Sequence, residues 1–289
     1  MNRALALVLL LCACSAPEGV GTGTFALMEP DATLTGRRNF FDFPWPSDVR
    51  KKDDGRLDVD GWPGPELPEL APFKPVAASR RAFPTLPVGY FHFNGAVAKR
   101  ETLEAYAPVI ESPVLLLELR EGQAPKLLPV VAFTLPPDPY TIDNLLAVAP
   151  RPGVVLRGGV THAFVVLRSF GNADGAKLGI PPLLHELAGG KTPAGARGAK
   201  LPALYGPLFT ALDTLKVPRS EVAAATVFTT SDEVAANAEL AEKMRAKYPV
   251  NLEVLDVEQD PRFDTQPFCH LRARVTMPQF QKGEAPFNT

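Results

Sequence analysis

The chain has 289 residues, enough for two small domains or one large domain with extended arms. Hydrophobic residues make up 46% and charged residues 21% of the sequence, so we expect a folded core and exclude wholesale disorder. A net charge of -2 gives no electrostatic field that would attract nucleic acid or an anionic membrane surface. The proline content is unusual, because the 31 prolines make up about twice the usual share of about 5%. So many prolines favour extended segments over long helices.

The first stretch, MNRALALVLLLCACSAPEG, has the features of an export signal. Arg3 supplies a positive start, and the apolar run at 4–11 is too short to span a bilayer, which takes about 20 residues in a helix. The letters LCAC resemble a bacterial lipobox, with Leu11 at its first position. The resemblance implies a lipoprotein signal over 1–14, lipidation at Cys14, and an exported protein anchored in the bacterial cell envelope, at the outer membrane or cell surface. An ordinary secretory peptide is the alternative.

The three cysteines allow no intrachain disulfide in the mature protein. Cys12 leaves with the predicted signal and Cys14 carries the lipid, so Cys269 is left without a partner. We expect Cys269 to be a small buried hydrophobic residue, and the fold to be stabilised by its core alone.

Two proline-rich or glycine-rich stretches follow the signal. The sequence over 15–38 begins SAPEGVGTGT and predicts a flexible tether. The sequence over 39–87 predicts an extended arm along the surface of a domain, with a turn at 53–55. This arm is too aromatic for a free linker, since it contains Phe40, Phe41, Phe43, Trp45 and Trp62. Its acidic residues do not have the spacing of a calcium-binding loop.

Residues 88–180 have the pattern of an antiparallel β-sandwich. In GYFHFNG, Phe91 and Phe93 alternate with Tyr90 and His92. Strand-length apolar runs follow, bounded by Pro and Gly, namely PVLLLEL, LLPVVAF, LLAVAP and VTHAFVVLR, the last over 160–168. His162 shares a strand face with apolar neighbours, so we interpret it as a packed residue rather than a metal ligand.

Helical and β patterns alternate over 181–276. The run LPALYGPLFTALDTL predicts an amphipathic helix over 201–215 that Pro207 kinks or splits in two. AAATVFTT predicts a buried strand, and Ser231 or Asp232 can cap the helix DEVAANAELAEKMRAKY. NLEVLDV and HLRARVT predict further strands. The order suggests either the start of an α/β layer or one layer covering the sandwich, and 277–289 is expected to extend toward a domain that the chain lacks.

The sequence provides no catalytic, cofactor-binding or metal-binding constellation. HELAGGKT matches only half of a zincin motif and half of a phosphate-binding loop. Of the serines, only Ser169 has even one of the two glycines of a nucleophile elbow, at Gly171. Cys269 and His270 are adjacent on a predicted strand, so their side chains point to opposite faces.

Several short motifs, in order, resemble the N-terminal, bacterial Ig-like region of virulence-factor-type lipases and related lipid-anchored α/β-hydrolases. The arm matches at FPWPSDV over 43–49. Further matches are NLLAVAPRPGVVLRGGVTHAFVVLRSFGNADGAKLG and EVAAATVFTTSDEVA, and the similarity covers about 39–281. In that family a hydrolase domain carrying the catalytic serine follows this region, so the resemblance implies an Ig-like sandwich and a following hydrolase domain as partner.

Three functions are consistent with the sequence. The first is a non-catalytic accessory region of a lipid-anchored esterase or lipase, truncated before the catalytic domain, that tethers and orients the hydrolase. The second is a stand-alone envelope lipoprotein that binds a protein, glycan or peptide. The third is an enzyme in its own right, for which Ser169 would be the residue to test.

Overall fold

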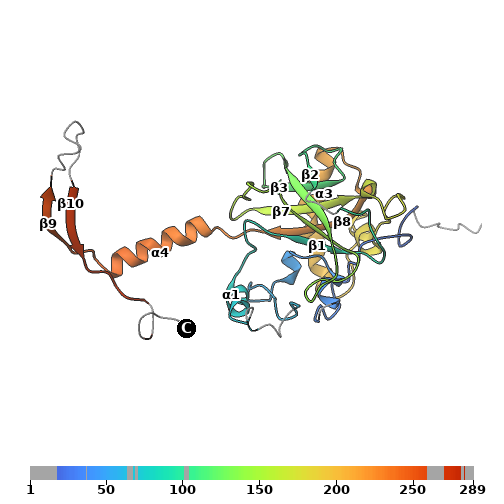
Figure 1. The fold of residues 1–289 in the computed structure, drawn as a ribbon. Helices are drawn as coiled ribbons and strands as arrows, with labels where there is room; N and C mark the ends of the chain where they lie inside the picture. The colour runs from blue at the N-terminus through green and yellow to red at the C-terminus, as the bar shows by residue number, and fades with distance from the viewer. Residues whose placement is uncertain are drawn as a thin grey trace, which may run out of the picture. The chain divides into compact units, whose positions relative to one another are not determined.

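The computed structural model describes residues 18–36, 38–63, 68, 71–100, 104–258, 270–280 and 283 (Figure 1). The predicted signal, its lipidation site Cys14, and Cys269 lie outside the described residues. The chain divides into two compact units, residues 1–231 and residues 232–289. The fold is mixed α+β with antiparallel sheets, which confirms the predicted fold class at this level.

Two four-stranded antiparallel sheets form the first unit. One has the strand order β1-β6-β5-β2, and the other has the order β4-β3-β7-β8. The strands are β1 (Gly89–His92), β2 (Glu104–Tyr106), β3 (Val114–Leu119), β4 (Lys126–Leu128), β5 (Val130–Leu135), β6 (Leu145–Pro150), β7 (Thr161–Leu167) and β8 (Val222–Thr229). The apolar run LLPVVAF is thus divided between the sheets, because Pro129 cannot donate a ladder hydrogen bond and separates β4 from β5.

The sheets face each other across a shared core. Phe91 of β1, Val148 of β6, Phe164 of β7 and Phe228 of β8 belong to the same buried cluster. β3 is buried on both faces, since Leu116 belongs to this cluster and its neighbours along the strand belong to a second one. The side chains of a strand alternate between its two faces, and both faces of β3 are buried, which explains why the strand is apolar at every position from Val114 to Leu117.

A helical layer covers the outer face of the β4-β3-β7-β8 sheet. It consists of α2 (Pro182–Ala188) and α3 (Leu201–Thr214), whose apolar residues form the second core with β3, β7 and β8. Tyr205 on α3 is buried and donates a hydrogen bond to the carbonyl of Ala225, 2.9 Å away. Of the two arrangements predicted for 181–276, this part of the chain therefore has the covering layer, and β8 pairs directly with β7.

Pro207 does not split α3, contrary to one of the two predicted outcomes. The helix is continuous from Leu201 to Thr214 with Pro207 inside it. Proline removes the hydrogen bond that the carbonyl of Ala203 would accept, and both residues lie on the exposed side of the helix. Water can satisfy that carbonyl, so the helix continues.

The proline-rich arm enters both cores and does not only follow the surface as predicted. Phe40 and Trp45 belong to the core between the sheets, and Phe43 belongs to the core under the helices. A large aromatic ring stabilises the fold more when it is buried than when it is exposed. This explains why the arm enters the cores instead of following the surface. The turn predicted at 53–55 is confirmed, with the Gly55 N–H bonded to the Lys52 carbonyl. Short helices occur at η1 (Asn39–Asp42), η2 (Asp48–Arg50) and α1 (Phe73–Ser79).

The flexible tether predicted for 15–38 is wrong over its described part. Val20 forms a β-bridge with Ile180, and Ala26 and Leu34 are buried. Gly179 allows this docking, because a Cβ at that position would lie 2.1 Å from the carbonyl oxygen of Thr22. The glycines of the stretch itself, Gly19, Gly21 and Gly23, have positive φ, so its composition reflects a specific backbone conformation rather than freedom.

Replacing Gly179 by Ala is expected to lower the free energy of unfolding by about 1–3 kcal/mol, because the 18–24 segment must move away from the added methyl group. Gly189→Ala is the matched control, since its Cβ would approach no atom closer than 3.5 Å. Urea unfolding of both variants measures the effect. Equal stability of the two variants would show that the segment is not packed as described.

The second unit contains α4 (Glu233–Lys247), β9 (Leu252–Glu258) and β10 (His270–Val275). These elements confirm the predicted helix and strands, and Asp232 caps α4 by accepting a hydrogen bond from the Ala235 N–H at 2.9 Å. β9 and β10 form a two-stranded antiparallel sheet. Among the described side chains of this unit, none is buried.

The remaining short helices of the first unit are η3 (Arg168–Phe170), η4 (Gly198–Lys200) and η5 (Arg219–Glu221). They connect strands and helices. The two cores are the main source of stability. Whether the sandwich has Ig-like topology stays a prediction.

Candidate functional site

The residues considered for catalysis are not brought together. Ser169 lies in η3, after the end of β7, and Gly171 follows it with φ +83°. His185 lies in α2 and His162 in β7, where it is fully buried and stacks on Phe228 at 6.0 Å. The interpretation of His162 as a packed residue is confirmed. Within the described ranges, no group of three or more His, Cys, Asp or Glu could hold a metal ion.

His92 and Asp42 come nearest to a catalytic pair. The Nδ1 atom of His92 lies 3.3 Å from the Asp42 carboxylate, and His92 is buried. In the part of the chain that the structure describes, no hydroxyl or thiol group is hydrogen-bonded to this imidazole. The pair joins η1 to β1 and has no nucleophile, so its geometry is that of a structural contact.

Both buried histidines should make the first unit less stable in acid. Burial lowers the pKa of His92 and of His162 below the usual 6.5. As the pH falls through 6.5, these histidines become protonated in the unfolded chain before they do in the folded one. The folded state is therefore progressively destabilised as the pH falls from 6.5 to the lower pKa values of the folded state. We expect the urea midpoint to be lower at pH 5.5 than at pH 7.5. In His162→Gln the difference should shrink, and an unchanged pH dependence would contradict the assignment of this residue.

Residues 43–50, which we call the N-terminal clip, fasten the arm across the edges of both sheets. Trp45 exchanges backbone hydrogen bonds with Tyr90 of edge strand β1. The carbonyl of Pro46 accepts a hydrogen bond from Thr226 of edge strand β8. Asp48 accepts two from Thr229, from its hydroxyl at 2.6 Å and its N–H at 3.2 Å. Unpaired strand edges invite association, so covering them protects the sandwich.

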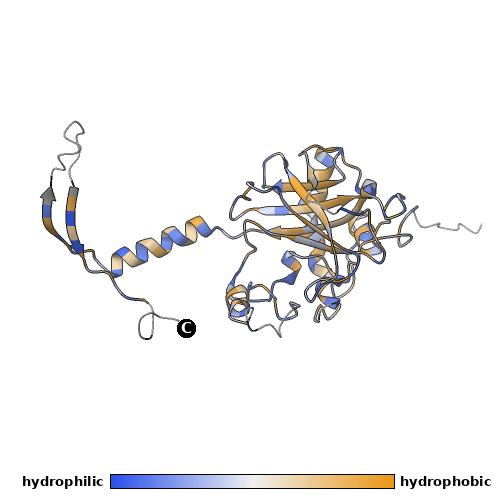
Figure 2. Cartoon of the chain, viewed as in Figure 1, coloured by the Kyte–Doolittle hydropathy of each residue, from blue (hydrophilic) through white to orange (hydrophobic). Residues whose placement is uncertain are grey.

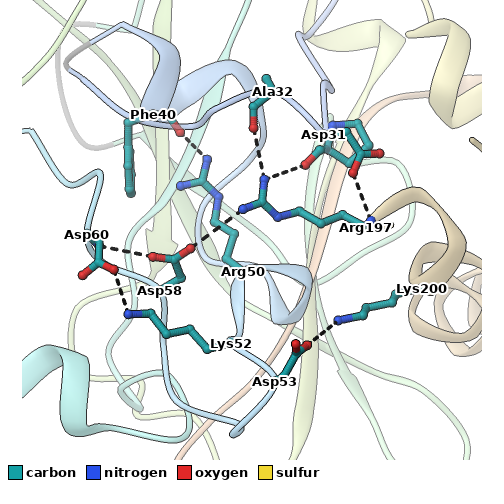
Figure 3. A network of polar contacts seen from close by, with 11 residues as sticks. Asp31, Ala32, Phe40, Arg50, Lys52, Asp53, Asp58, Asp60, Arg197 and Lys200 are labelled. Atoms are coloured by element: carbon teal, nitrogen blue, oxygen red, sulfur yellow. Dashed lines mark hydrogen bonds and ion pairs between the residues drawn. The ribbon is translucent and has the colours of Figure 1, made fainter. Parts of the chain in front are cut away.

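A network of charged residues joins the arm to the segment before α3 (Figure 3). Arg197 donates to the carbonyls of Pro30 and Ala32, and its Nη2 atom lies 3.8 Å from the Asp58 carboxylate. Asp31 accepts hydrogen bonds from the N–H groups of Arg197 and Gly198, which fixes the start of η4. Of these residues, only Asp58 stood out in the sequence, as one of the acidic residues whose spacing does not fit a calcium-binding loop.

Arg50 is the buried member of the network, with only 3% of its surface exposed. Its Nη2 atom donates to the carbonyls of Phe40 and Phe43, and its guanidinium carbon lies 4.2 Å from the Phe40 ring centroid. Burial, and then the nearby positive charge of Arg197, lower the pKa of Arg50 to about 9. Its Nε atom is buried without a hydrogen-bond partner.

A cavity lies between the 25–32 segment and α2. Its volume is about 420 Å³, within the usual range for small-molecule sites. The lining is proline-rich and apolar, with Glu29, Asp31 and Glu186 as its charged residues. Asp31 is already engaged with the η4 backbone, so the remaining charged groups are two glutamates.

The sheet of the second unit has one apolar face, formed by residues from both strands. The register pairs Leu252 with Val275 and Val254 with Ala273, and Leu271 follows in alternation on β10. We call these five residues the apolar face. The opposite face is charged, with Arg272 paired to Asp256 and Arg274 to Glu253, the latter at 3.3 Å.

The apolar face is open to solvent. Leu252, Val254 and Leu271 are 55%, 53% and 56% exposed. α4 provides no matching apolar stripe, because hydrophilic and hydrophobic residues are mixed along its length (Figure 2). A two-stranded sheet with an uncovered apolar face lacks the second layer that would bury this face and complete a core.

Comparisons with known proteins do not identify the chain. No protein-family model, no curated protein and no solved structure matches it. No helix in the described ranges is long and apolar enough to cross a membrane.

Proposed function

We propose that the chain is a non-catalytic accessory region of a lipid-anchored bacterial esterase or lipase-like hydrolase, and that its second unit contacts the catalytic domain. The observation that carries this proposal is the exposed apolar face of β9 and β10. A two-stranded sheet alone is marginally stable in water, so this face requires a covering layer. An α/β domain offers such a layer, because its sheet and helices bury apolar strands.

The first unit has a different role in this proposal. Its two cores, its covering helices and its clipped edges make it a rigid support, and its described residues contain no catalytic constellation. We propose that it orients the hydrolase relative to a lipid anchor at Cys14, in the bacterial cell envelope. The two antiparallel four-stranded sheets are compatible with the Ig-like architecture that the motif resemblance implies.

A second candidate function is a stand-alone envelope lipoprotein that binds a ligand itself. The 420 Å³ cavity beside α2 favours it, because a preformed apolar hollow with a few polar groups is typical of binding sites. The exposed apolar face favours the accessory role more, since a stand-alone protein gains nothing from leaving it uncovered.

The coding sequence beyond the Thr289 codon tests the accessory role. We expect a hydrolase domain with a Gly-x-Ser-x-Gly elbow, in frame or one shift away. Unrelated coding sequence in every frame would contradict the proposal.

An activity assay separates the accessory role from the third function that the sequence left open. We expect the purified chain to hydrolyse short-chain nitrophenyl esters no faster than buffer, and Ser169→Ala to change nothing. Steady turnover that is lost in Ser169→Ala would instead establish an enzyme.

A further inference from the structure

Backbone hydrogen bonds hold the first described residues of the chain against the first unit. The Gly21 N–H donates to the Ile180 carbonyl at 2.9 Å, and the Gly19 carbonyl accepts from the Ile180 N–H at 2.7 Å. The Thr24 carbonyl accepts a third bond, from the Gly179 N–H at 2.8 Å. These bonds, together with the close backbone approach at Gly179, fix the chain from Gly19 onward. We call residues 19–24 the docked segment.

Only a short length of chain separates the docked segment from the predicted lipidation site. Cys14 is five positions before Gly19. An extended chain spans at most about 3.6 Å per residue, so a lipid on Cys14 leaves a reach of at most about 18 Å. A compact unit of about 210 residues has a radius of gyration of about 17 Å and is about 40 Å across. The reach is therefore less than half of the width of the first unit.

The docked segment and α1 lie at opposite sides of the first unit (Figure 1). Lys177 is exposed and precedes the two residues that bind the docked segment, Gly179 and Ile180, by only a few positions. Val76 is exposed on α1. Because the reach from Cys14 is shorter than the width of the unit, a lipid there can bring the side with Lys177 to a membrane, but not the side with α1.

We propose that the side of the first unit formed by residues 19–24 and 177–182 faces the lipid headgroups of the membrane that holds the anchor, with α1 turned away from that membrane. This inference rests on the lipid anchor of the proposed function. The length of the tether sets the orientation, so no attraction between charges is needed, and Lys177 already pairs with Glu221 at 3.2 Å. The first unit is thereby a support of fixed orientation for the hydrolase.

Energy transfer between the protein and labelled headgroups measures this orientation. The lipidated full chain with Cys269→Ser is reconstituted in phosphatidylcholine vesicles that carry acceptor dyes on their headgroups. The donor dye is attached to Lys177→Cys or to Val76→Cys. We expect transfer to be at least about twofold more efficient from position 177, because most of the width of the unit separates position 76 from the membrane. Equal efficiency from the two positions would overturn the proposal.

A longer tether is the matched control. Inserting 20 Gly and Ser residues between Pro17 and Glu18 adds a flexible chain with a mean span of about 25 Å and leaves the docked segment in place. The difference between the two donor positions should then disappear, and a difference that persists would show that the tether does not set the orientation.

Flotation with the same vesicles tests the anchor separately. We expect the full chain to float with the vesicles and Cys14→Ser to stay behind. Equal flotation of the two would refute the lipid anchor itself, whereas flotation that depends on Cys14 together with equal energy transfer would refute only the orientation.

Discussion

Replacing Phe43 by Ala is expected to lower the free energy of unfolding of the first unit by about 3–5 kcal/mol. Phe43 is fully buried in the core beneath the helical layer, among residues of β3, β7 and α3. Removing its ring leaves a cavity that neighbouring side chains can fill only in part, so both the lost burial and the cavity contribute. Urea unfolding at neutral pH measures the change.

Phe73→Ala is the matched control, because it removes the same ring from the same proline-rich arm at a position that is 66% exposed. We expect its effect to stay within about 0.5 kcal/mol, as for most surface substitutions. A small loss of stability for Phe43→Ala, similar to that of Phe73→Ala, would mean that the arm follows the surface and does not enter the core.

Replacing Asp48 by Ala is expected to cost about 2–4 kcal/mol. The carboxylate accepts two hydrogen bonds from Thr229 and pairs with Lys51 at 2.7 Å, and hydrogen bonds to charged groups contribute about 1.5–3 kcal/mol each. The substitution would also leave the Thr229 N–H at the edge of β8 without its acceptor. The free energy of unfolding, again from urea, tests the N-terminal clip as a structural device.

Asp53→Ala provides the comparison for Asp48. The Asp53 side chain is fully exposed and its ion pair with Lys200 lies in solvent, where such pairs contribute little. We expect no measurable change. If Asp48→Ala were equally harmless, the FPWPSDV motif would need an explanation other than holding the arm on β8.

The elements with strong local patterns were predictable from the sequence. The strand expected over 160–168 is β7 at Thr161–Leu167, and the capping role allowed for Asp232 is realised at α4. Alternation and capping are local properties, so a short window of sequence is enough to reveal them.

Contacts between distant segments were not predictable in the same way. Asp48 and Thr229 are 181 positions apart, and nothing in either neighbourhood indicates the other. Arg50 lies in the run VRKKDD, which has the composition of a solvated turn, yet its side chain is buried against Phe40. The β-bridge between Val20 and Ile180 was likewise not predictable, because the composition around Val20 is typical of a linker.

Amide hydrogen exchange on the purified chain tests most directly the claim that the second unit is incomplete by itself. We predict that amides of β9 and β10 exchange at least about a thousandfold faster than those of β7 and β8, because the apolar face has no covering layer. This result would support a role as an accessory region that another domain completes. Equal protection of the two pairs of strands would contradict it, since the sheet of the second unit would then be stable without a partner.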